Sequence, residues 1–390
     1  MSARPHRVCV VTGSRAEYGL LYWVLRDLQA APDIELQLIV TGMHLAPEFG
    51  LTVRDIEADG FEIHRRVEML LSSDTPGGIA KSIGLGVIGM SDALAQLAPD
   101  VVLLPGDRFE ILAAAQACLV HRIAVAHLAG GDTSEGAFDE SIRHAITKMA
   151  HVHLVTTPEA AQRVRQLGED SRHIHVVGSP SLDHLRRAPL LDRAALETAL
   201  AAPLGERNLL VTFHPVTLEP DEGVQQCVEM LAALDRLEPE IALWFTQSNA
   251  DNSGRAMMAL IEQWVAARQQ RARLYSSLGQ LRYLSLMSQA DAVVGNSSSG
   301  LYEAPSFGIA TVNIGNRQRG RLAAASVIHC APERAAIQAS IARALTLDCS
   351  GTVNPYGDGK SAARIVEILK TIRPSAELLK KSFHSLEGSS

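Results

Sequence analysis

A short run of β-branched and apolar residues, closed by Gly or Pro and followed by a helical pattern, recurs along this chain of 390 residues. This alternation is typical of βαβ units, which build parallel sheets covered by helices. Each half of the chain carries enough runs for one doubly wound α/β domain. The predicted strands of the first half are residues 8–12, 36–41, 101–105, 123–128, 153–156 and 174–177, and those of the second are 209–213, 241–245, 273–275, 292–294, 310–314 and 327–329.

The spacing of prolines indicates where one domain ends and the next begins. A chain of this length favours two domains. Between residues 179 and 208 the strand pattern is interrupted by Pro180, Pro189 and Pro203, which bracket a helix-prone stretch. We therefore predict an N-terminal domain over residues 1–183 and a second domain over residues 184–372.

Charge and cysteine usage exclude several classes of protein. The formal net charge of −7 gives no global basic field for a nucleic acid or an anionic membrane, so phosphate recognition must be local. The apolar run after Arg4 and Arg7 is only a strand long, which predicts neither a signal peptide nor a membrane span. Five widely separated cysteines without a Cys-x-x-Cys pair indicate buried thiols in a cytoplasmic protein.

Two histidine pairs raise the question of a metal. His151 and His153, like His173 and His175, alternate along strands and would share a face, but no third ligand lies nearby in sequence. The chain also lacks the glycine fingerprint of dinucleotide-binding folds and the phosphate loop of ATPases. We expect no metal and no tightly bound cofactor.

Ligands of open α/β sheets bind beyond the carboxyl ends of the strands, so the residues after each run are the candidates for a site. After the first strand, Gly13 opens a helix whose free N–H groups favour an anion, and Arg15 can add a charged fork to a phosphate. A plain strand-to-helix turn is the alternative. After the third predicted strand comes Asp107, which can serve as an acid or base or can simply cap the next helix.

A glycine-rich loop after the fourth predicted strand leads into a charged helix. Asp139 and Arg143 share one face of that helix, as do Glu140 and His144. Clustered carboxylates beside His and Arg suit acid–base catalysis, because repulsion and burial separate their pKa values. A solvated helix face with ion pairs is the alternative, and the preceding glycine loop favours function.

The second half repeats the pattern of polar residues after strands. His214 follows the first of these strands, and Ser248 and Asn249 follow the next in a polar loop. The strongest segment runs from Gly295 to Pro305, where a serine and glycine loop can bind a diphosphate and an acid can reach a ribose diol. Three arginines on the loop of residues 315–321 suit a phosphate or a carboxylate.

Together these segments resemble the hydrolysing UDP-N-acetylglucosamine 2-epimerases of sialic acid biosynthesis and their relatives for legionaminic acid. The resemblance extends in order from the first predicted strand to the last sheet region. It is carried by residues 12–19 (TGSRAEYG), 41–44 (TGMH), 106–108 (GDR), 142–149 (IRHAITKM), 295–300 (GNSSSG) and 313–321 (NIGNRQRGR).

The resemblance implies a GT-B fold, with two Rossmann-like domains facing across a cleft and a C-terminal helix, about residues 373–390, packed back on the N-terminal domain. It also implies anti-elimination of UDP to a 2-acetamidoglucal and then hydration, without a redox cofactor. The catalytic residues so implied are Asp107, Asp132, Asp139, Arg143 and His214. The substrate-binding residues are Arg15, Glu17, His44, Glu135, His144, Ser248, Asn249, Asn296, Ser297, Ser298, Ser299, Gly300, Glu303, Arg317 and Arg321.

One departure concerns the glycine loop. Members of the family often carry Glu just before or just after the two glycines, where this chain has Ala129 and Asp132. We expect Asp132 to serve in its place, with Glu135 as the reserve candidate. A non-catalytic nucleotide-sugar sensor is the alternative that Ala129 raises.

The leading hypothesis is release of N-acetylmannosamine from UDP-N-acetylglucosamine, feeding nonulosonic (sialic) acid biosynthesis. The nearest rival is the same reaction on UDP-2,4-diacetamido-2,4,6-trideoxyglucose, which would favour an apolar pocket around C6. A GT-B glycosyltransferase and a reversible, non-hydrolysing epimerase are further alternatives. We also expect a homo-oligomer, a dimer or a tetramer, with apolar helices such as residues 84–97 forming its face.

Overall fold

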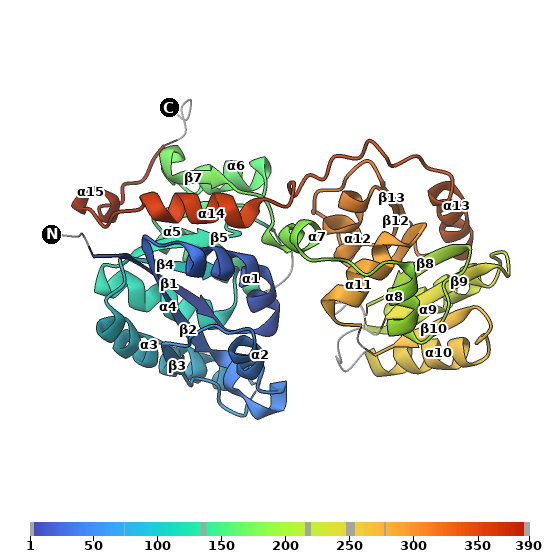
Figure 1. Cartoon of the computed structure of the whole chain (residues 1–390), viewed down its shortest axis with the longest axis horizontal. Coiled ribbons are helices and arrows are strands. Elements are labelled where there is room, and N and C mark those ends of the chain that lie inside the picture. The colour runs from blue at the N-terminus through green and yellow to red at the C-terminus, as the bar shows by residue number, and fades with distance from the viewer. Residues whose placement is uncertain are drawn as a thin grey trace. The chain divides into compact units, whose positions relative to one another are not determined.

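Two compact units make up the chain in this computed structural model, which describes residues 4–73, 75–133, 138–214, 220–246, 254–276 and 278–385 (Figure 1). The first unit comprises residues 1–184 and 356–390, and the second comprises residues 185–355. The chain passes from the first unit to the second after residue 184, one residue beyond the predicted boundary. It returns to the first unit at residue 356, earlier than the predicted residue 373.

The first unit is built on a seven-stranded parallel sheet in the order β3-β2-β1-β4-β5-β6-β7. Most of its central strands are buried throughout, which matches the apolar runs of the sequence and is typical of a sheet covered on both faces. Its strands are β1 (His6–Thr12), β2 (Ile34–Thr41), β3 (Arg65–Val67), β4 (Val101–Pro105), β5 (Ala124–Leu128), β6 (Val152–Val155) and β7 (Ile174–Val176).

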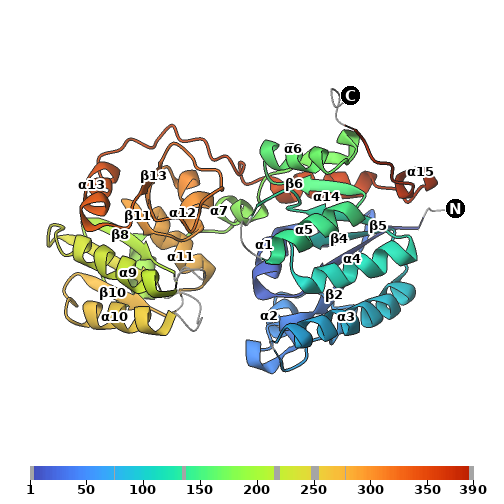
Figure 2. The same cartoon turned by 180° about the vertical axis from the view of Figure 1, so that it is seen from behind.

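Helices cover both faces of this sheet. One core cluster joins the sheet to α1, α2 and α14, and another joins its opposite face to α3, α4 and α5 (Figure 2). The helices of the unit are α1 (Arg15–Ala30), η1 (Gly42–Leu45), η2 (Pro47–Phe49), α2 (Val53–Ala58), α3 (Pro76–Leu97), α4 (Phe109–His121), α5 (Phe138–Met149), α6 (Pro158–Gln166), η3 (Ser171–His173), η4 (Pro180–Leu182), α7 (Asp183–Arg187, which crosses the boundary), α14 (Ser361–Thr371) and α15 (Ala376–Leu379).

The helix α14 belongs to the first unit, although its residues were predicted to lie in the second domain. Ile365 and Leu369 are fully buried in the core shared with α1. The carboxylate of Asp183 accepts hydrogen bonds from the backbone N–H groups of Ser361 (3.0 Å) and Ala362 (3.1 Å), so it caps the start of the helix. The amphipathic pattern of this helix predicts that it packs on a sheet but not on which one.

The chain leaves and re-enters the first unit at neighbouring points. The backbone N–H of Ser179 donates to the carbonyl of Tyr356 (2.7 Å). Gly178 and Gly357 both have positive φ, and a Cβ on Gly357 would lie 3.2 Å from the Cα of Gly178. Glycine therefore permits the two segments to pass this close.

The second unit holds a six-stranded parallel sheet in the order β10-β9-β8-β11-β12-β13. Helices α9, α10 and α13 pack on one face, and α8 and α11 on the other. Its strands are β8 (Arg207–Thr212), β9 (Ile241–Thr246), β10 (Ala272–Tyr275), β11 (Ala292–Gly295), β12 (Ala310–Ile314) and β13 (Val327–Cys330), and its helices are α8 (Arg193–Leu200), α9 (Pro220–Leu234), α10 (Gly254–Ala266), α11 (Gly279–Ser288), α12 (Ser299–Tyr302), η5 (Ala304–Phe307) and α13 (Arg334–Ala344). The fold class predicted from the sequence, two Rossmann-like parallel-sheet domains, is confirmed.

Within the described part of the chain, α3 is the one helix long and apolar enough to span a membrane. Its residues Met90 and Leu94 are buried in the core of the first unit, where α3 packs along α4. Core packing accounts for part of the apolar character of α3, since 33% of its most apolar window is buried.

Candidate active site

Most of the predicted site residues that the structure describes gather at the carboxyl ends of the strands where the strand order reverses. In the first unit this switch point lies between β1 and β4, whose following segments carry Arg15 and Asp107. In the second unit it lies between β8 and β11, which are followed by His214 and Asn296. Open parallel sheets bind ligands at such points, because the two flanking loops diverge there.

Arg143 is the centre of the polar cluster in the first unit. Its guanidinium forms an ion pair with the carboxylate of Asp107. Its Nη1 donates to Oε2 of Glu140 (2.6 Å) and to the backbone carbonyl of Asp132 (2.7 Å). The side chain is only 7% exposed, so these contacts are shielded from water. One arginine thus joins the loop after β4, the glycine loop after β5, and α5.

Two further groups of α5 lie in the same cluster. Burial raises the pKa of Asp139, and the neighbouring Asp107 carboxylate adds to this effect, while Arg108 and Arg143 act against it. Nε2 of His144 lies 3.3 Å from Oε1 of Glu140. A carboxyl with a raised pKa next to a second carboxyl is a candidate for acid–base catalysis.

The glycine loop after β5 brings Asp132 to its place. Oδ1 of Asp132 accepts a hydrogen bond from Thr156 Oγ1 (2.5 Å), and Ala129 adopts a positive φ of 63°. A Cβ on Gly130 would lie 2.9 Å from Thr147 Oγ1, and one on Gly131 only 2.4 Å from the carbonyl oxygen of Ala160. Both glycines are therefore required by close packing. The reserve candidate Glu135 lies outside the described residues.

His127 supports the site but was not among the predicted site residues. It lies within β5, whereas the prediction considered the residues that follow each strand. Its Nε2 meets the carbonyl oxygen of Gly106 at 2.7 Å, and its Nδ1 lies 3.1 Å from Thr147 Oγ1. Burial lowers the pKa of His127 to about 3, so the ring is neutral and Nε2–H can donate to that carbonyl. His127 fixes the peptide directly before Asp107. The sequence did carry a sign of this role, since His127 is a polar residue within an otherwise apolar strand.

Two predicted substrate-binding residues are buried beneath the site. His44 is fully buried between Thr12 Oγ1 (3.1 Å) and Thr52 Oγ1 (2.7 Å), and burial lowers its pKa to about 4. Glu17 accepts a hydrogen bond from the backbone N–H of Gly13 (2.7 Å). Burial raises the pKa of Glu17 to about 8. Both side chains support the loops around them in this structure, and their predicted contact with substrate stays a prediction.

A second arginine holds the loop after β4. Arg108 donates through Nε and Nη2 to the carboxylate of Glu110 (3.2 and 3.0 Å), which is fully buried. Arg15, by contrast, lies exposed in the first turn of α1, where a helix N-terminus and a cation can act together on an anion.

In the second unit, Asn296 fixes the backbone around His214. Its side-chain Oδ1 accepts from the N–H of His214 (2.7 Å), and its Nδ2 donates to the carbonyl of His214 (2.9 Å). Asn296 is 1% exposed and positions the backbone of His214, while its predicted substrate contact stays a prediction. Its own carbonyl accepts from Gln318 Nε2 (2.8 Å) and Arg317 Nη1 (3.1 Å). Gln318 was missed because amides carry no sequence signal of this kind.

The serine loop is ordered by its own hydroxyls. Ser299 Oγ lies 2.6 Å from the hydroxyl of Tyr283 and 3.0 Å from Ser297 Oγ, while Ser297, Ser298 and Ser299 all remain partly accessible. Gly300 is buried, since a Cβ there would lie 2.6 Å from Thr311 Cγ2. Close packing therefore requires glycine at this position, and its predicted contact with substrate stays a prediction.

The helix that follows the serine loop is short. The helix α12 has four residues, and Glu303 caps its C-terminal end. Arg321 Nη1 donates to Gln318 Oε1 (2.9 Å), and its guanidinium lies over the ring of Tyr302. The predicted residues Ser248 and Asn249 lie outside the described residues.

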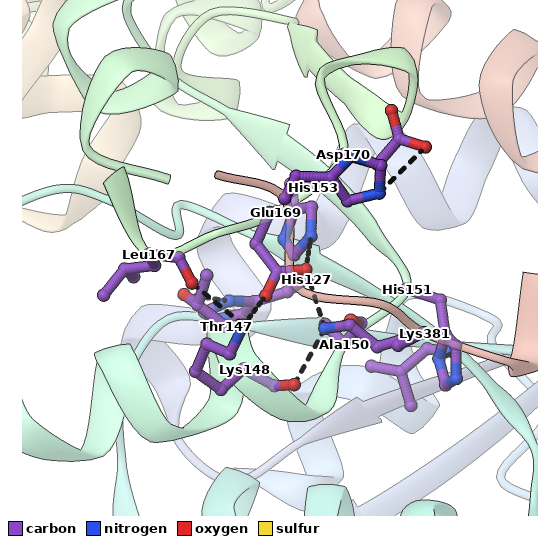
Figure 3. A network of polar contacts seen from close by, with 12 residues as sticks. His127, Thr147, Lys148, Ala150, His151, His153, Leu167, Glu169, Asp170 and Lys381 are labelled. Atoms are coloured by element: carbon purple, nitrogen blue, oxygen red, sulfur yellow. Dashed lines mark hydrogen bonds and ion pairs between the residues drawn. The ribbon is translucent and has the colours of Figure 1, made fainter. Parts of the chain in front are cut away.

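The described residues contain no group of three potential metal ligands. His151 Nδ1 accepts a hydrogen bond from the N–H of Val125 (3.1 Å). His153 Nε2 lies 3.0 Å from Glu169 Oε2, as Figure 3 shows. Glu169 also forms ion pairs with Lys148 (2.5 Å) and Lys381 (2.7 Å). This network fastens the C-terminal segment to the first unit.

Comparison with known proteins identifies the family. The model of the UDP-N-acetylglucosamine 2-epimerase family matches residues 26–370. The GDP/UDP-N,N'-diacetylbacillosamine 2-epimerase (hydrolyzing) of Campylobacter jejuni is 38% identical over 322 residues, which cover 83% of each chain. The UDP-N,N'-diacetylbacillosamine 2-epimerase (hydrolyzing) of Legionella pneumophila is 35% identical over 375 residues, or 96% of this chain and 98% of that one.

Among solved structures, the UDP-GlcNAc 2-epimerase of Neisseria meningitidis bound to UDP-GlcNAc has a TM-score of 0.75 at 19% identity, covering 94% of this chain and 100% of that one. The chain belongs to the UDP-N-acetylglucosamine 2-epimerase family. It is an enzyme of the UDP-sugar 2-epimerase type, and the resemblance to hydrolysing 2-epimerases predicted from the sequence is confirmed.

Proposed function

We propose that the chain catalyses the hydrolytic 2-epimerisation of a UDP-2-acetamido-2-deoxyhexose, using water to release UDP and the free sugar with inverted C2. The observation that carries this proposal is the cluster around Arg143, in which Asp107, Asp139 and Glu140 lie at the switch point of a parallel sheet. Carboxyl groups in unlike environments can separately remove and return a proton.

The reaction divides into two balanced steps. In the first, a base removes the proton on C2 while the C1–O bond to UDP breaks, leaving a 2-acetamidoglucal and UDP. In the second, water adds its hydroxyl to C1 and a proton returns to C2 from the opposite face. No electrons are exchanged with a cofactor in either step.

We assign the proton transfers to carboxylates of the first unit. Asp107 and Asp139 are the acid and base, and Asp132 is the third candidate because it is tied to the same arginine through its backbone carbonyl. Arg143 orients Asp107 through their ion pair. His144 is held at the edge of the cluster by Glu140, where it can contact the sugar.

We assign the grip on UDP to the second unit. Ser297, Ser298 and Ser299 offer hydroxyls to the diphosphate, and Glu303 offers two acceptor oxygens to the ribose. The backbone clamp on His214 supports a role for that side chain beside the diphosphate. Arg317 and Arg321 of this unit supply positive charge for the diphosphate, and Arg15 of the first unit is a further candidate for a phosphate contact.

Two sugars compete as the natural substrate. The family is named for UDP-N-acetylglucosamine, and the corresponding product would be N-acetylmannosamine for sialic acid synthesis. The relatives in Campylobacter jejuni and Legionella pneumophila are instead named for N,N'-diacetylbacillosamine, the 2,4-diacetamido-2,4,6-trideoxy sugar. These names support the second substrate.

The test is to incubate purified enzyme in heavy water with each UDP-sugar and no acceptor. We expect UDP release and a free sugar carrying deuterium at C2. A glycosyltransferase would release no UDP under these conditions, and a non-hydrolysing epimerase would yield the 2-epimeric UDP-sugar. Failure to release UDP from either substrate would contradict the proposal.

We further propose that the enzyme acts in the cytoplasm as a homo-oligomer. Its five cysteines are free, which suits a reducing compartment. Leu85 and Ile88 of α3 are 43% and 64% exposed, and they offer an apolar face for a second copy. Analytical ultracentrifugation tests the assembly, since a monomer at micromolar concentration would contradict it.

A further inference from the structure

A cavity of about 420 Å³ opens beside the candidate active site, within the first unit. This volume is in the range of small-molecule sites. Its lining comes from the segments that follow β2, β3 and β4, together with the first turns of α3. The lining residues are Met43, Glu48, Phe49, Leu70, Leu71, Ser72, Ser73, Ile79, Ser82, Arg108 and Phe109.

The wall formed by residues 70–73 is held against α3. Ser82 Oγ accepts a hydrogen bond from the N–H of Leu71 (3.1 Å). A Cβ on Gly78 would lie 2.4 Å from the carbonyl oxygen of Ser73, so only glycine allows the segment to approach the helix this closely. The cavity is therefore shaped by the folded chain before any ligand arrives.

The lining is mostly apolar and presents unburied surface. Phe49 and Leu71 are 47% and 40% exposed at this cavity. A ligand that covers such apolar surface gains binding free energy, roughly 25 cal/mol for each Å² removed from water. A hydroxyl placed against the same walls would lose its hydrogen bonds to water.

One cation lies among these apolar walls. Arg108 lines the cavity while Glu110 engages its Nε and Nη2, and its Nη2 also lies 3.3 Å from Met43 Sδ. A guanidinium carries five N–H donors, more than these contacts with described residues use. Arg108 can therefore donate to a carbonyl oxygen that enters the cavity.

We propose that this cavity binds the C4–C6 end of the sugar and selects a 6-deoxy-4-acetamido hexose over a sugar with hydroxyls at C4 and C6. Arg108 and Phe109 line the cavity and directly follow Asp107, the proposed acid–base residue for C1 and C2, so we place the neighbouring C4–C6 end in the cavity. The C6 methyl and the acetamido methyl meet the apolar walls, and the acetamido carbonyl meets Arg108. This inference rests on the proposed function and names its substrate class.

The chemistry of the walls distinguishes the two competing sugars. UDP-2,4-diacetamido-2,4,6-trideoxyglucose presents two methyl groups and one carbonyl at this end, which match Phe49, Leu71 and Arg108. UDP-N-acetylglucosamine presents two hydroxyls there. Single-group differences of this kind change kcat/KM by about 10- to 200-fold.

The experiment measures kcat/KM for UDP release from both UDP-sugars with the full-length enzyme. We expect the diacetamido sugar to be preferred by about tenfold or more. Leu71→Asn should reduce this preference by about tenfold, because an amide replaces an apolar wall. The matched control is Leu119→Asn on α4, where the side chain is 50% exposed and outside the cavity, and it should leave the ratio unchanged.

The outcomes separate this inference from the proposed function. Equal use of both sugars, a preference for UDP-N-acetylglucosamine, or an unchanged ratio in folded Leu71→Asn would overturn the specificity assignment while the epimerase function stands. Release of UDP from neither sugar would refute the proposed function itself. Should Leu71→Asn fail to fold, the ratio of the two kcat/KM values in the wild-type enzyme still tests the specificity assignment.

Discussion

Arg143 and Asp107 are joined by an ion pair that links α5 to the segment after β4, and Arg143 is almost completely buried in making it. The same guanidinium reaches Glu140 and the carbonyl of Asp132. Three chain segments thus depend on a single side chain for their relative positions.

Arg143→Lys should lower kcat/KM for UDP release by about 100-fold, because one ammonium group cannot span three acceptors and small displacements of catalytic groups are costly. Steady-state kinetics measures the effect. Arg172→Lys is the control, since its pair with Asp170 is exposed and distant from the cluster. Equal activities in the two variants would refute the organising role of Arg143.

Asp107→Asn should abolish turnover while UDP still binds. An amide cannot accept the proton that a carboxylate accepts, and loss of an acid–base group costs about 10²- to 10⁴-fold in rate. Calorimetric titration with UDP should give a dissociation constant close to wild type, since we assign UDP to the other unit. Near-wild-type turnover would rule out Asp107 as a proton carrier.

Glu17 should make stability depend on pH. Burial raises its pKa from 4.5 to about 8, so between these values the folded chain keeps a proton that the unfolded chain releases. The contribution of Glu17 to the free energy of unfolding is therefore fully present below pH 4.5. It is lost as the pH rises through the folded-state pKa of about 8, at a rate of up to about 1.4 kcal/mol per pH unit. Urea unfolding of wild type and Glu17→Gln from pH 5 to 9 tests this, and the variant should show the shallower decline.

Gly131→Ala should destabilise the fold and reduce activity. The added Cβ would lie 2.4 Å from the carbonyl oxygen of Ala160, at a residue with a φ of 79°. Strain of this kind costs about 1–3 kcal/mol. Gly19→Ala is the matched control, because a Cβ in the middle of α1 meets nothing within 4 Å. That variant should gain about 0.5–1 kcal/mol, and a similar loss in both would refute the packing argument.

Asn296→Ala should weaken UDP binding by releasing the backbone of His214. Unpaired backbone groups should also cost about 1–3 kcal/mol in the free energy of unfolding. Asn354→Ala is a useful comparison, since Asn354 donates hydrogen bonds to the carbonyl of Tyr302 and to Ser306 Oγ. If both variants bind UDP equally well, the clamp on His214 has no functional role.

The strand framework was predictable because buried parallel strands are continuous apolar runs bounded by turn residues. The one missed strand shows the limit of this signal. β3 consists of Arg65, Arg66 and Val67 at the edge of the sheet and pairs only with β2. Three residues with two charges carry neither the length nor the apolar character that a central strand requires.

Positions of site residues in sequence were easier to predict than their exposure. Asp107 and Arg143 follow from strand ends and helix spacing, and the structure brings them together. His44, Glu17 and Asn296 satisfy the same patterns, yet tertiary packing buries them. The apolar cavity could not be predicted, because its walls come from three segments far apart in the chain.

The neighbouring crossings at Ser179 and Tyr356, together with the cap that Asp183 gives to α14, make the second unit an insertion within the first. During synthesis the first 184 residues emerge without the helix that completes their core, although domains made first generally fold first. The ribosome must finish the entire inserted unit before Ile365 and Leu369 can reach α1. The N-terminal unit therefore completes its fold last.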